Sequence, residues 1–482
     1  MRCTWFIPLG ASLLILGGCA QMNGRAASDE PTSAHTTPAA WFKSAPAIIP
    51  VTVPEKDLAT WWHQLGDPML DQLIAEAITA APDVRTAQAK LRQSRANRDL
   101  ATANLLPSIG ASASAKRSRS GSEAGGNGSA QTLYAAGFDA SWEPSIFGGL
   151  RDAANGAEAD TAAAASSLDS VRASLAAEVA LNYVTLRANQ RRLGIARDNV
   201  ASQSETLQIT EWRAQAGLVT MLDVEQARTN LEQSKSSIPS LESGRAETEN
   251  HLAVLTGQAP GSLHGRLGTT LPLPRAPDEV AVGIPADTLR QRPDVRAAEL
   301  GLRAEMARSA QREAERYPSL TLSGSLGWQA FSAAALGGSG TLVQTLAGSL
   351  AVTLFDGGRI RSRIAVQNAV QEQALVAYEK SILTALEDVE NALTAYAAGR
   401  ERVVARRRAA ESARSANALA RTLYESGAAD FQKVLDTDRT RLTAEDSLAA
   451  ADADVLTAVI TLYKALGGGW QNTNPNLTQT EE

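Results

Sequence analysis

The tetrapeptide Pro82-Asp83-Val84-Arg85 occurs a second time as Pro293-Asp294-Val295-Arg296, 211 residues further along the chain. Other short matches keep this spacing to within two residues: Pro107-Ser108 with Pro318-Ser319, Gly148-Gly149 with Gly357-Gly358, and Gly217 with Gly427. A solenoid has a far shorter period. The sequence therefore predicts one structural unit used twice, as a first half at 61–270 and a second half at 271–466.

Each half ends in a long stretch of helical character, at about 150–256 and 358–466, with hardly a proline. Apolar side chains in the second stretch recur at every third or fourth position: Leu375, Tyr378, Ile382, Leu386, Val389, Leu393 and Tyr396. This spacing is typical of a coiled-coil-like helix. We expect two helical hairpins whose first arms extend on the order of 100 Å, at 1.5 Å per residue.

Shorter segments change to a period of two. Apolar residues alternate with polar ones at 131–143, 319–330 and 343–355, and more weakly at 108–119. Such alternation predicts strands with one apolar and one polar face, arranged as hairpins at 108–143 and 319–355. A single segment fits the edge of a soluble sandwich equally well. Four segments of about 10 to 13 residues, at matching places in two halves, favour tilted strands that cross a bilayer.

Four strands are too few to close a barrel. Open strand edges are not tolerated in lipid, and closure needs about eight strands or more. Three copies of the chain would supply about twelve, at four per copy. The sequence thus predicts a membrane protein that works as an oligomer.

The N-terminus has the features of a bacterial lipoprotein signal. Arg2 precedes an apolar stretch from Trp5 to Leu16, and Leu16-Gly17-Gly18-Cys19 is similar to a lipobox. We expect a signal peptide at 1–18, acylation of Cys19 with palmitate as one acyl group, a tether at 19–60 and a C-terminal tail at 467–482. Several acyl chains anchor a protein stably, and Ala20 favours the outer membrane over the inner one. An ordinary secretory signal is the alternative.

Composition excludes several classes of function. The chain has 46 Lys+Arg against 52 Asp+Glu and shows no basic stripe with interleaved aromatics, so nucleic acid is not an expected partner. It has two cysteines and four histidines, and no two histidines stand at metal-binding helical spacing. We therefore expect neither an enzyme nor a metal site. No cofactor is expected beyond the covalent lipid on Cys19.

Several motifs together resemble those of the TolC-type outer membrane factor family, in its NodT-like branch of efflux-pump lipoproteins. In chain order they are Trp61 to Leu70, Gly137 to Glu143, Arg292 to Arg296, Leu354 to Arg359, Tyr424 to Gly427, and Val434 to Asp436. They cover nearly the whole chain, although each one alone is weak.

The resemblance implies an α+β membrane protein that forms a homotrimer. Each protomer would give four strands to one 12-stranded outer-membrane β-barrel, which a long periplasmic α-helical barrel continues. It further implies a passive export channel in a tripartite efflux system. A periplasmic adaptor protein and an inner-membrane pump of the RND type would deliver the substrate, and outer-membrane lipid would surround the barrel.

The resemblance also implies roles for particular residues. Tyr424, Asp436 and Arg439 match positions that form the periplasmic gate or its locking contacts in relatives. Three Asp436 carboxylates on a threefold axis would bind cations and narrow the entrance. From spacing alone, Asp436 and Arg439 also fit a surface pair at i and i+3. The helix turns would contact the adaptor through Gly217, Thr220, Gly427 and Asp430.

Two other classes of function remain open. A general diffusion porin would need many more strands per chain and no long helices. A structural periplasmic coiled-coil lipoprotein would leave the alternating segments without a role. The exported substrate is open too, since drugs, solvents, metal ions, aromatic acids, siderophores and proteins all fit a polar tunnel.

Overall fold

The computed structural model describes residues 38–42, 48–49, 58–119, 121, 123, 129–277 and 279–470. The expected signal peptide, Cys19 and most of the expected tether lie outside these ranges, as do the tail residues 471–482. No helix among the described residues is both long and apolar enough to cross a membrane.

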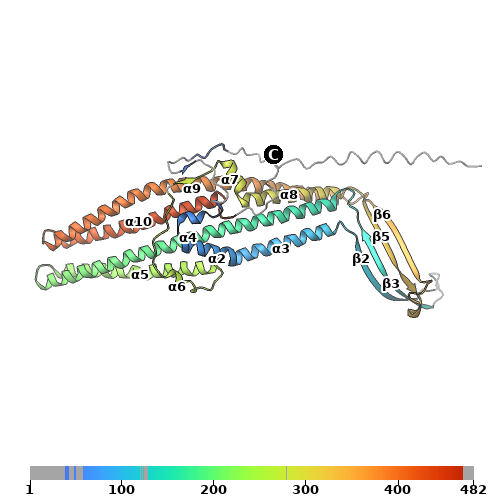
Figure 1. Cartoon of the computed structure of the whole chain (residues 1–482), viewed down its shortest axis with the longest axis horizontal. Helices are drawn as coiled ribbons and strands as arrows, with labels where there is room; N and C mark the ends of the chain where they lie inside the picture. Colours follow the sequence, from blue (N-terminus) through green and yellow to red (C-terminus); the bar gives the residue numbers. More distant parts are fainter. Residues whose placement is uncertain are drawn as a thin grey trace, which may run out of the picture. The chain divides into compact units, whose positions relative to one another are not determined.

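The two halves repeat the same order of elements, which confirms the internal repeat (Figure 1). The first half contains α3 (Pro82–Ala103), β2 (Ser108–Arg119), β3 (Ala130–Trp142), α4 (Gly149–Gln215) and α5 (Met221–Leu255). The second contains α8 (Pro293–Ala314), β5 (Ser319–Ala330), β6 (Leu342–Ala351), α9 (Arg359–Glu425) and α10 (Phe431–Ala465). The matching long helices have equal lengths, with 67 residues in α4 and α9 and 35 in α5 and α10.

The remaining elements are short. Those around the middle of the long helices are a 3-10 helix at Trp61–Leu65, α2 (Pro68–Ala80), α6 (His264–Leu267), α7 (Pro285–Gln291), and the two-residue strands β1 (Ile48–Ile49) and β4 (Val280–Ala281). A 3-10 turn at Ala333–Ala335 connects β5 to β6 at the end of the sheet away from the helices.

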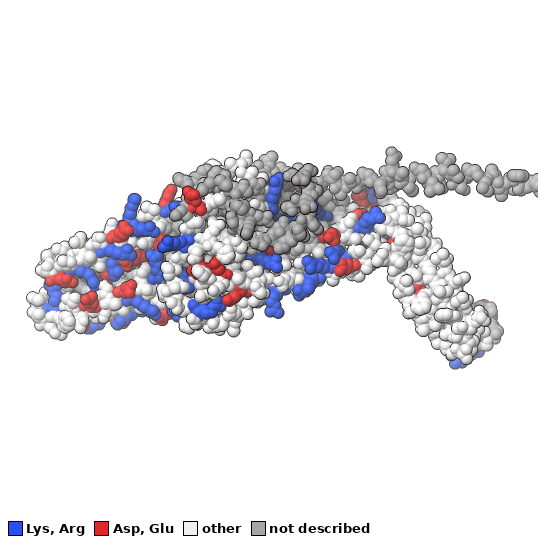
Figure 2. Space-filling model, in the orientation of Figure 1, with Lys and Arg blue, Asp and Glu red and all other residues white. Residues whose placement is uncertain are grey.

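The four longer strands form one antiparallel sheet in the order β2-β3-β5-β6, so the two hairpins meet where β3 pairs with β5. Side chains of paired residues share a face. The register therefore places Ile109, Phe138, Leu326 and Leu346 on one face, and Ser112, Asp139, Ser325 and Thr345 on the other. This division confirms the strands that the period-two alternation predicts, although β6 ends at Ala351 rather than at residue 355. On the face shown in Figure 2 the strands are almost free of charge, whereas the helices carry both signs.

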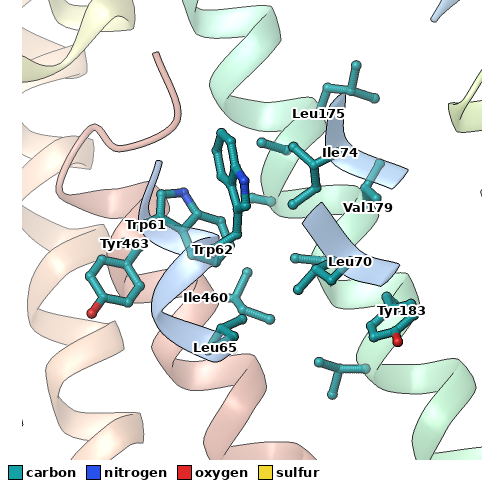
Figure 3. Packing of buried hydrophobic residues seen from close by; sticks show 14 of the residues in the cluster. Trp61, Trp62, Leu65, Leu70, Ile74, Leu175, Val179, Tyr183, Ile460 and Tyr463 are labelled. Atoms are coloured by element: carbon teal, nitrogen blue, oxygen red, sulfur yellow. The ribbon is translucent and has the colours of Figure 1, made fainter. Parts of the chain in front are cut away.

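The main core lies where the short elements pack on the long helices (Figure 3). Trp61 is fully buried; its ring stacks on Tyr463, with the ring centroids 5.4 Å apart, and meets Trp62 edge-on. Leu70 and Ile74 of α2 belong to the same cluster. The tryptophan motif is thus the piece that fastens the N-terminal part of the chain to α10.

Gly66 and Asp67 end the tryptophan motif and begin α2. Gly66 has a φ of 63°, which a residue without a Cβ adopts most readily, and the Asp67 carboxylate caps α2 by accepting from the Met69 and Leu70 amides. The Tyr183 hydroxyl donates to the other Asp67 oxygen at 2.7 Å. The fully buried Arg187 donates in turn to the Tyr183 hydroxyl at 2.9 Å. A polar chain of contacts therefore locks α2 to α4.

Two expected boundaries need correction. Within the expected tether at 19–60, the Trp41 indole donates to the Gly283 carbonyl at 2.7 Å, and Ile48–Ile49 pairs with Val280–Ala281 as parallel strands. Within the expected tail, the Gly469 amide donates to the Leu58 carbonyl at 3.1 Å. Both segments thus contact the helical body, because backbone groups that leave a packed core still need hydrogen-bond partners.

The raised pKa of the Tyr463 hydroxyl predicts that the folded protein loses stability at alkaline pH. Burial raises the pKa of Tyr463 from 10.0 to about 12, while its hydroxyl donates to the Gln64 side chain at 2.6 Å. A folded-state pKa above the unfolded one stabilises the protein below about pH 10, and this stabilisation disappears as the pH rises toward 12. Thermal unfolding of Tyr463→Phe should therefore depend less on pH between 10 and 12 than that of the wild type. An equal pH dependence in both proteins would contradict this assignment.

Candidate functional site

The two helical hairpins reverse in turns of the same construction, at the end of the helices away from the strands (Figure 1). Gly217 and Gly427 have φ values of 73° and 78°, which end α4 and α9 in the left-handed conformation. Thr220 forms a capping box with Asp223 at the start of α5. The Asp430 carboxylate accepts from the Lys433 amide at the start of α10. These four residues thus shape the turns.

The turn of the first hairpin exposes apolar side chains. Leu218, Met221 and Leu222 are all largely exposed. Exposing a cluster of apolar side chains to water is unfavourable, so such a cluster indicates a contact surface.

Tyr424 lies at the end of α9 in a small apolar cluster with Ala227, Phe431, Val434 and Leu435. Arg213 of α4 lies over the Tyr424 ring, 4.4 Å from its centroid, and donates to the Tyr424 carbonyl at 2.6 Å. The buried Tyr424 hydroxyl has no hydrogen-bond partner among the described residues. Tyr424 is thus part of the contact between the two hairpins.

Asp436 and Arg439 are both exposed on α10. Asp436 accepts from the Gln432 amide at 3.3 Å, whereas Arg439 donates to the Asn230 amide oxygen of α5 at 2.8 Å. The local pair between Asp436 and Arg439, which spacing alone allowed, is therefore not the arrangement in the structure. Arg439 links the hairpins, and the second carboxylate oxygen of the exposed Asp436 has no hydrogen-bond partner among the described residues.

A group of polar side chains on facing sides of α4 and α10, here called the cross-hairpin seam, comprises Asn199, Gln203, Asp438, Arg441 and Glu445. Gln203 donates to Asp438 at 3.0 Å, and Arg441 donates to Asn199 at 2.9 Å. Arg441 also donates to Asp438 at 3.0 Å and to Glu445 at 3.2 Å. All five are buried or half-buried. The seam is thus a hydrogen-bonded ion network that joins the two hairpins.

Further contacts continue the seam in both directions. Nearer the turns, the Arg421 guanidinium donates to the Ser202 carbonyl and the Thr206 hydroxyl, at 3.0 and 2.7 Å. Farther from the turns, Arg192 makes a two-pronged bond with Asp446 at 2.6 and 3.0 Å, and Arg191 pairs with Asp452 at 2.9 Å. The hairpins are therefore held together at several levels.

Sequence reasoning missed the cross-hairpin seam. Asp438, Arg441 and Glu445 stand at i, i+3 and i+7, so they share one face of α10. That spacing is a signal for a polar face. It does not reveal that the face is buried against α4.

The three histidines in the described part of the chain each pair with a carboxylate. His63 lies 3.0 Å from Asp71, His251 lies 3.3 Å from Glu178, and His264 lies 2.8 Å from Glu249. Among the described residues, no three His, Cys, Asp or Glu side chains come together as a possible metal site.

Comparison with known proteins gives this geometry a context. The chain is similar to a solved structure described as the outer-membrane channel OprN, with a TM-score of 0.85 and 32% identity, over 92% of this chain and 100% of that one. It is 33% identical to the pyoverdine export outer membrane protein OpmQ of Pseudomonas putida, over 92% of this chain and 94% of that protein. It is 29% identical to the toluene efflux pump outer membrane protein TtgF of the same species, over 86% of each chain.

The repeated sheet and helical hairpins therefore define an outer-membrane channel whose helices lie in the periplasm. The family model described as Outer membrane efflux protein matches residues 73–258 and 284–468, which is most of both halves. The chain belongs to this family, and its role is that of an outer-membrane efflux channel.

Proposed function

We propose that three copies of the chain form one channel. The supporting observation is the sheet itself, in which four strands leave β2 and β6 as open edges. Lipid does not tolerate unpaired strand edges, and three copies would close them into a barrel of about 12 strands. The long hairpins of the three copies would line a periplasmic tunnel. Transport through the tunnel is passive.

The partners we propose are a periplasmic adaptor protein and an inner-membrane pump of the RND type. TtgF carries the words efflux pump in its name, which supports a pump partner for this chain. The adaptor would dock on the hairpin turns around Gly217, Thr220, Gly427 and Asp430. The exposed Leu218, Met221 and Leu222 give this surface an apolar centre. OpmQ is named for pyoverdine, and we propose that the pump and adaptor, rather than the channel, select the substrate.

We propose a lipid on Cys19 as the membrane anchor, in addition to the barrel. Its support is the lipobox sequence Leu16-Gly17-Gly18-Cys19. No other cofactor is proposed, and the protein is an export channel rather than an enzyme.

The proposed gate lies at the hairpin ends, at Tyr424, Asp436 and Arg439. Asp436 is exposed and its hydrogen-bond partner is the Gln432 amide, so no cation among the described residues neutralises its negative charge. Three such carboxylates around an axis would attract cations and repel one another. Arg439 and Tyr424 would hold the closed arrangement through Asn230 and Arg213.

The test is the single-channel conductance of the purified protein in a planar bilayer, after its mass in detergent is measured. We expect a trimer with a small, cation-selective conductance. Asp436→Ala should raise the conductance and reduce the cation selectivity, because it removes the proposed carboxylate ring. Arg439→Ala should raise the conductance without reducing the selectivity.

Two outcomes would overturn the proposal. A large conductance that neither substitution changes would exclude the gate and favour a general porin. A monomer without conductance would exclude the tunnel and favour a structural periplasmic lipoprotein.

A further inference from the structure

The apolar face of the sheet carries charge at one end only. Paired residues share a face, so the register extends this face along β2 from Ile109 to Arg119, at every second residue. Among the residues of β2, β3, β5 and β6, all of which the structure describes, Arg117 and Arg119 are the only charged ones on this face. Both lie at the end of the sheet farthest from the helices, where Figure 2 shows basic side chains. Because a charge that faces lipid is most unfavourable at mid-membrane, their depth decides what they can bind.

The aromatic residues of the apolar face mark its depth in the membrane. Trp142 ends β3 near the helices, and Tyr134 stands eight residues before it, about 26 Å away along the strand at 3.3 Å per residue. A strand tilt of about 40° reduces this span to roughly 20 Å along the membrane normal, which fits within the apolar band of about 25 Å that aromatic girdles flank in outer-membrane barrels. Trp328 of β5 pairs with Ala136, close to the level of Tyr134. The outer edge of the apolar band therefore lies near Tyr134.

The two arginines lie just outside this band. Arg117 pairs with Thr132 and Arg119 pairs with Ala130, which stand two and four residues beyond Tyr134. At 3.3 Å per residue, they lie roughly 7 and 13 Å past the aromatic girdle along the strand. Because the helices lie in the periplasm, this is the outer side of the membrane. The guanidinium groups thus lie at the level of the lipid head groups in the outer leaflet.

No group within the described part of the chain occupies these guanidinium groups. Arg117 and Arg119 are exposed, and neither has a hydrogen bond or an ion pair with another described residue. Residues 116–130 contain three basic residues and one acidic residue, Glu123. The corresponding end of the second hairpin, residues 330–342, contains no charged residue. This end of the first hairpin is therefore a positively charged surface that is available to an anionic partner.

We propose that Arg117 and Arg119 bind the phosphate group of a phosphorylated glycolipid in the outer leaflet. Arginine presents its N–H groups as a planar fork that matches two oxygens of a phosphate. Basic side chains at this depth bind anionic lipid head groups. The acyl chains of the same lipid would lie along Ala111, Ala113 and Ala115, which continue the face toward mid-membrane. This inference rests on the closed barrel of the proposed function and assigns the lipid that the outer rim of the barrel binds.

Lys116 provides a matched control on the same strand. It stands next to Arg117 and is exposed, but side chains alternate along a strand, so it lies on the polar face with Ser112 and Asp139. In a closed barrel this face lines the lumen. Lys116 therefore has the same charge at nearly the same depth, without access to the surrounding lipid.

Native mass spectrometry of the full-length protein in detergent tests the site, because it counts the lipids bound to each trimer. Lipid A, which carries phosphates on a sugar head group, should bind to the wild type. Arg117→Gln/Arg119→Gln should bind it at least about tenfold more weakly, since the charged hydrogen bonds are lost. Arg117→Lys/Arg119→Lys should lie between the two, because lysine keeps the charge without the fork. Lys116→Gln should bind lipid A as the wild type does.

Two further ligands identify the source of the phosphate. Lipid A from which the phosphates have been removed should bind at least about tenfold more weakly to the wild type. Inorganic phosphate at the same concentration should not displace lipid A, because it lacks the acyl chains that contact the apolar face.

Three outcomes would overturn the lipid site while leaving the trimer intact. They are equal binding of lipid A by the wild type and by Arg117→Gln/Arg119→Gln, an equal loss of binding in Lys116→Gln, and displacement of lipid A by inorganic phosphate. A wild-type protein that is monomeric in the same spectra would instead overturn the proposed function.

Discussion

Replacing Arg441 with glutamine is expected to raise the single-channel conductance several-fold. Arg441 is the centre of the cross-hairpin seam, where it binds Asn199, Asp438 and Glu445. Removing one partner of a buried ion network costs up to about 3–5 kcal/mol, because the remaining charges stay desolvated. This loss of free energy destabilises the state in which α4 and α10 are in contact. The variant should therefore favour separated hairpins and a wider tunnel.

Arg197→Gln is the matched control for this experiment. Arg197 pairs with Glu242 at 2.7 Å, but both residues belong to the first hairpin, and their side chains are 56% and 45% exposed. Its loss removes an equal charge without touching the contact between hairpins, so the conductance should stay at the wild-type level. Equal conductance for Arg441→Gln and Arg197→Gln would show that the seam does not hold the entrance closed.

Trp61→Ala should produce the largest loss of stability among single substitutions in the described core. Trp61 is fully buried, stacks on Tyr463 and lies beside Trp62. Replacing a buried tryptophan with alanine costs about 3–5 kcal/mol, because the cavity closes only in part. Because this residue fastens the short elements to α10, their attachment should loosen first. The free energy of unfolding in urea, followed by tryptophan fluorescence and by circular dichroism, measures the effect.

Trp212→Ala serves as the comparison, since Trp212 is exposed near the end of α4. The same change in side-chain volume there should alter the free energy of unfolding by no more than about 0.5 kcal/mol. If both variants lost the same stability, the stacking of Trp61 on Tyr463 would not be what holds the core.

The elements with a clear period could be predicted from the sequence. The alternation in β3, β5 and β6 reflects a sheet with two different faces, and the register places Phe138 opposite Leu326 on the apolar one. The turns can also be predicted from the sequence, because Gly217 and Gly427 stand at matching points of the repeat. Both glycines adopt a positive φ. Sequence patterns thus predict those elements whose conformation depends on residues close to one another in the sequence.

The contacts between the hairpins could not be predicted in this way. Gln203 and Asp438 are 235 residues apart in sequence, and only the packing of α4 on α10 brings them together. The pairing of β1 with β4 is also a tertiary effect, because two residues are too few to form a pattern. The sequence reveals the motif around Trp61, but it does not reveal that Tyr463, about 400 residues later, is the stacking partner of Trp61.

The equal length of α4 and α9 makes these helices a molecular ruler. Each has 67 residues, which spans about 100 Å at 1.5 Å per residue, and their turns lie at the same level. Any insertion or deletion in one helix would shift one turn against the other, and in the proposed trimer it would misplace half of the turns on which the proposed adaptor docks. Only changes made in both helices together could alter the reach of the channel across the compartment.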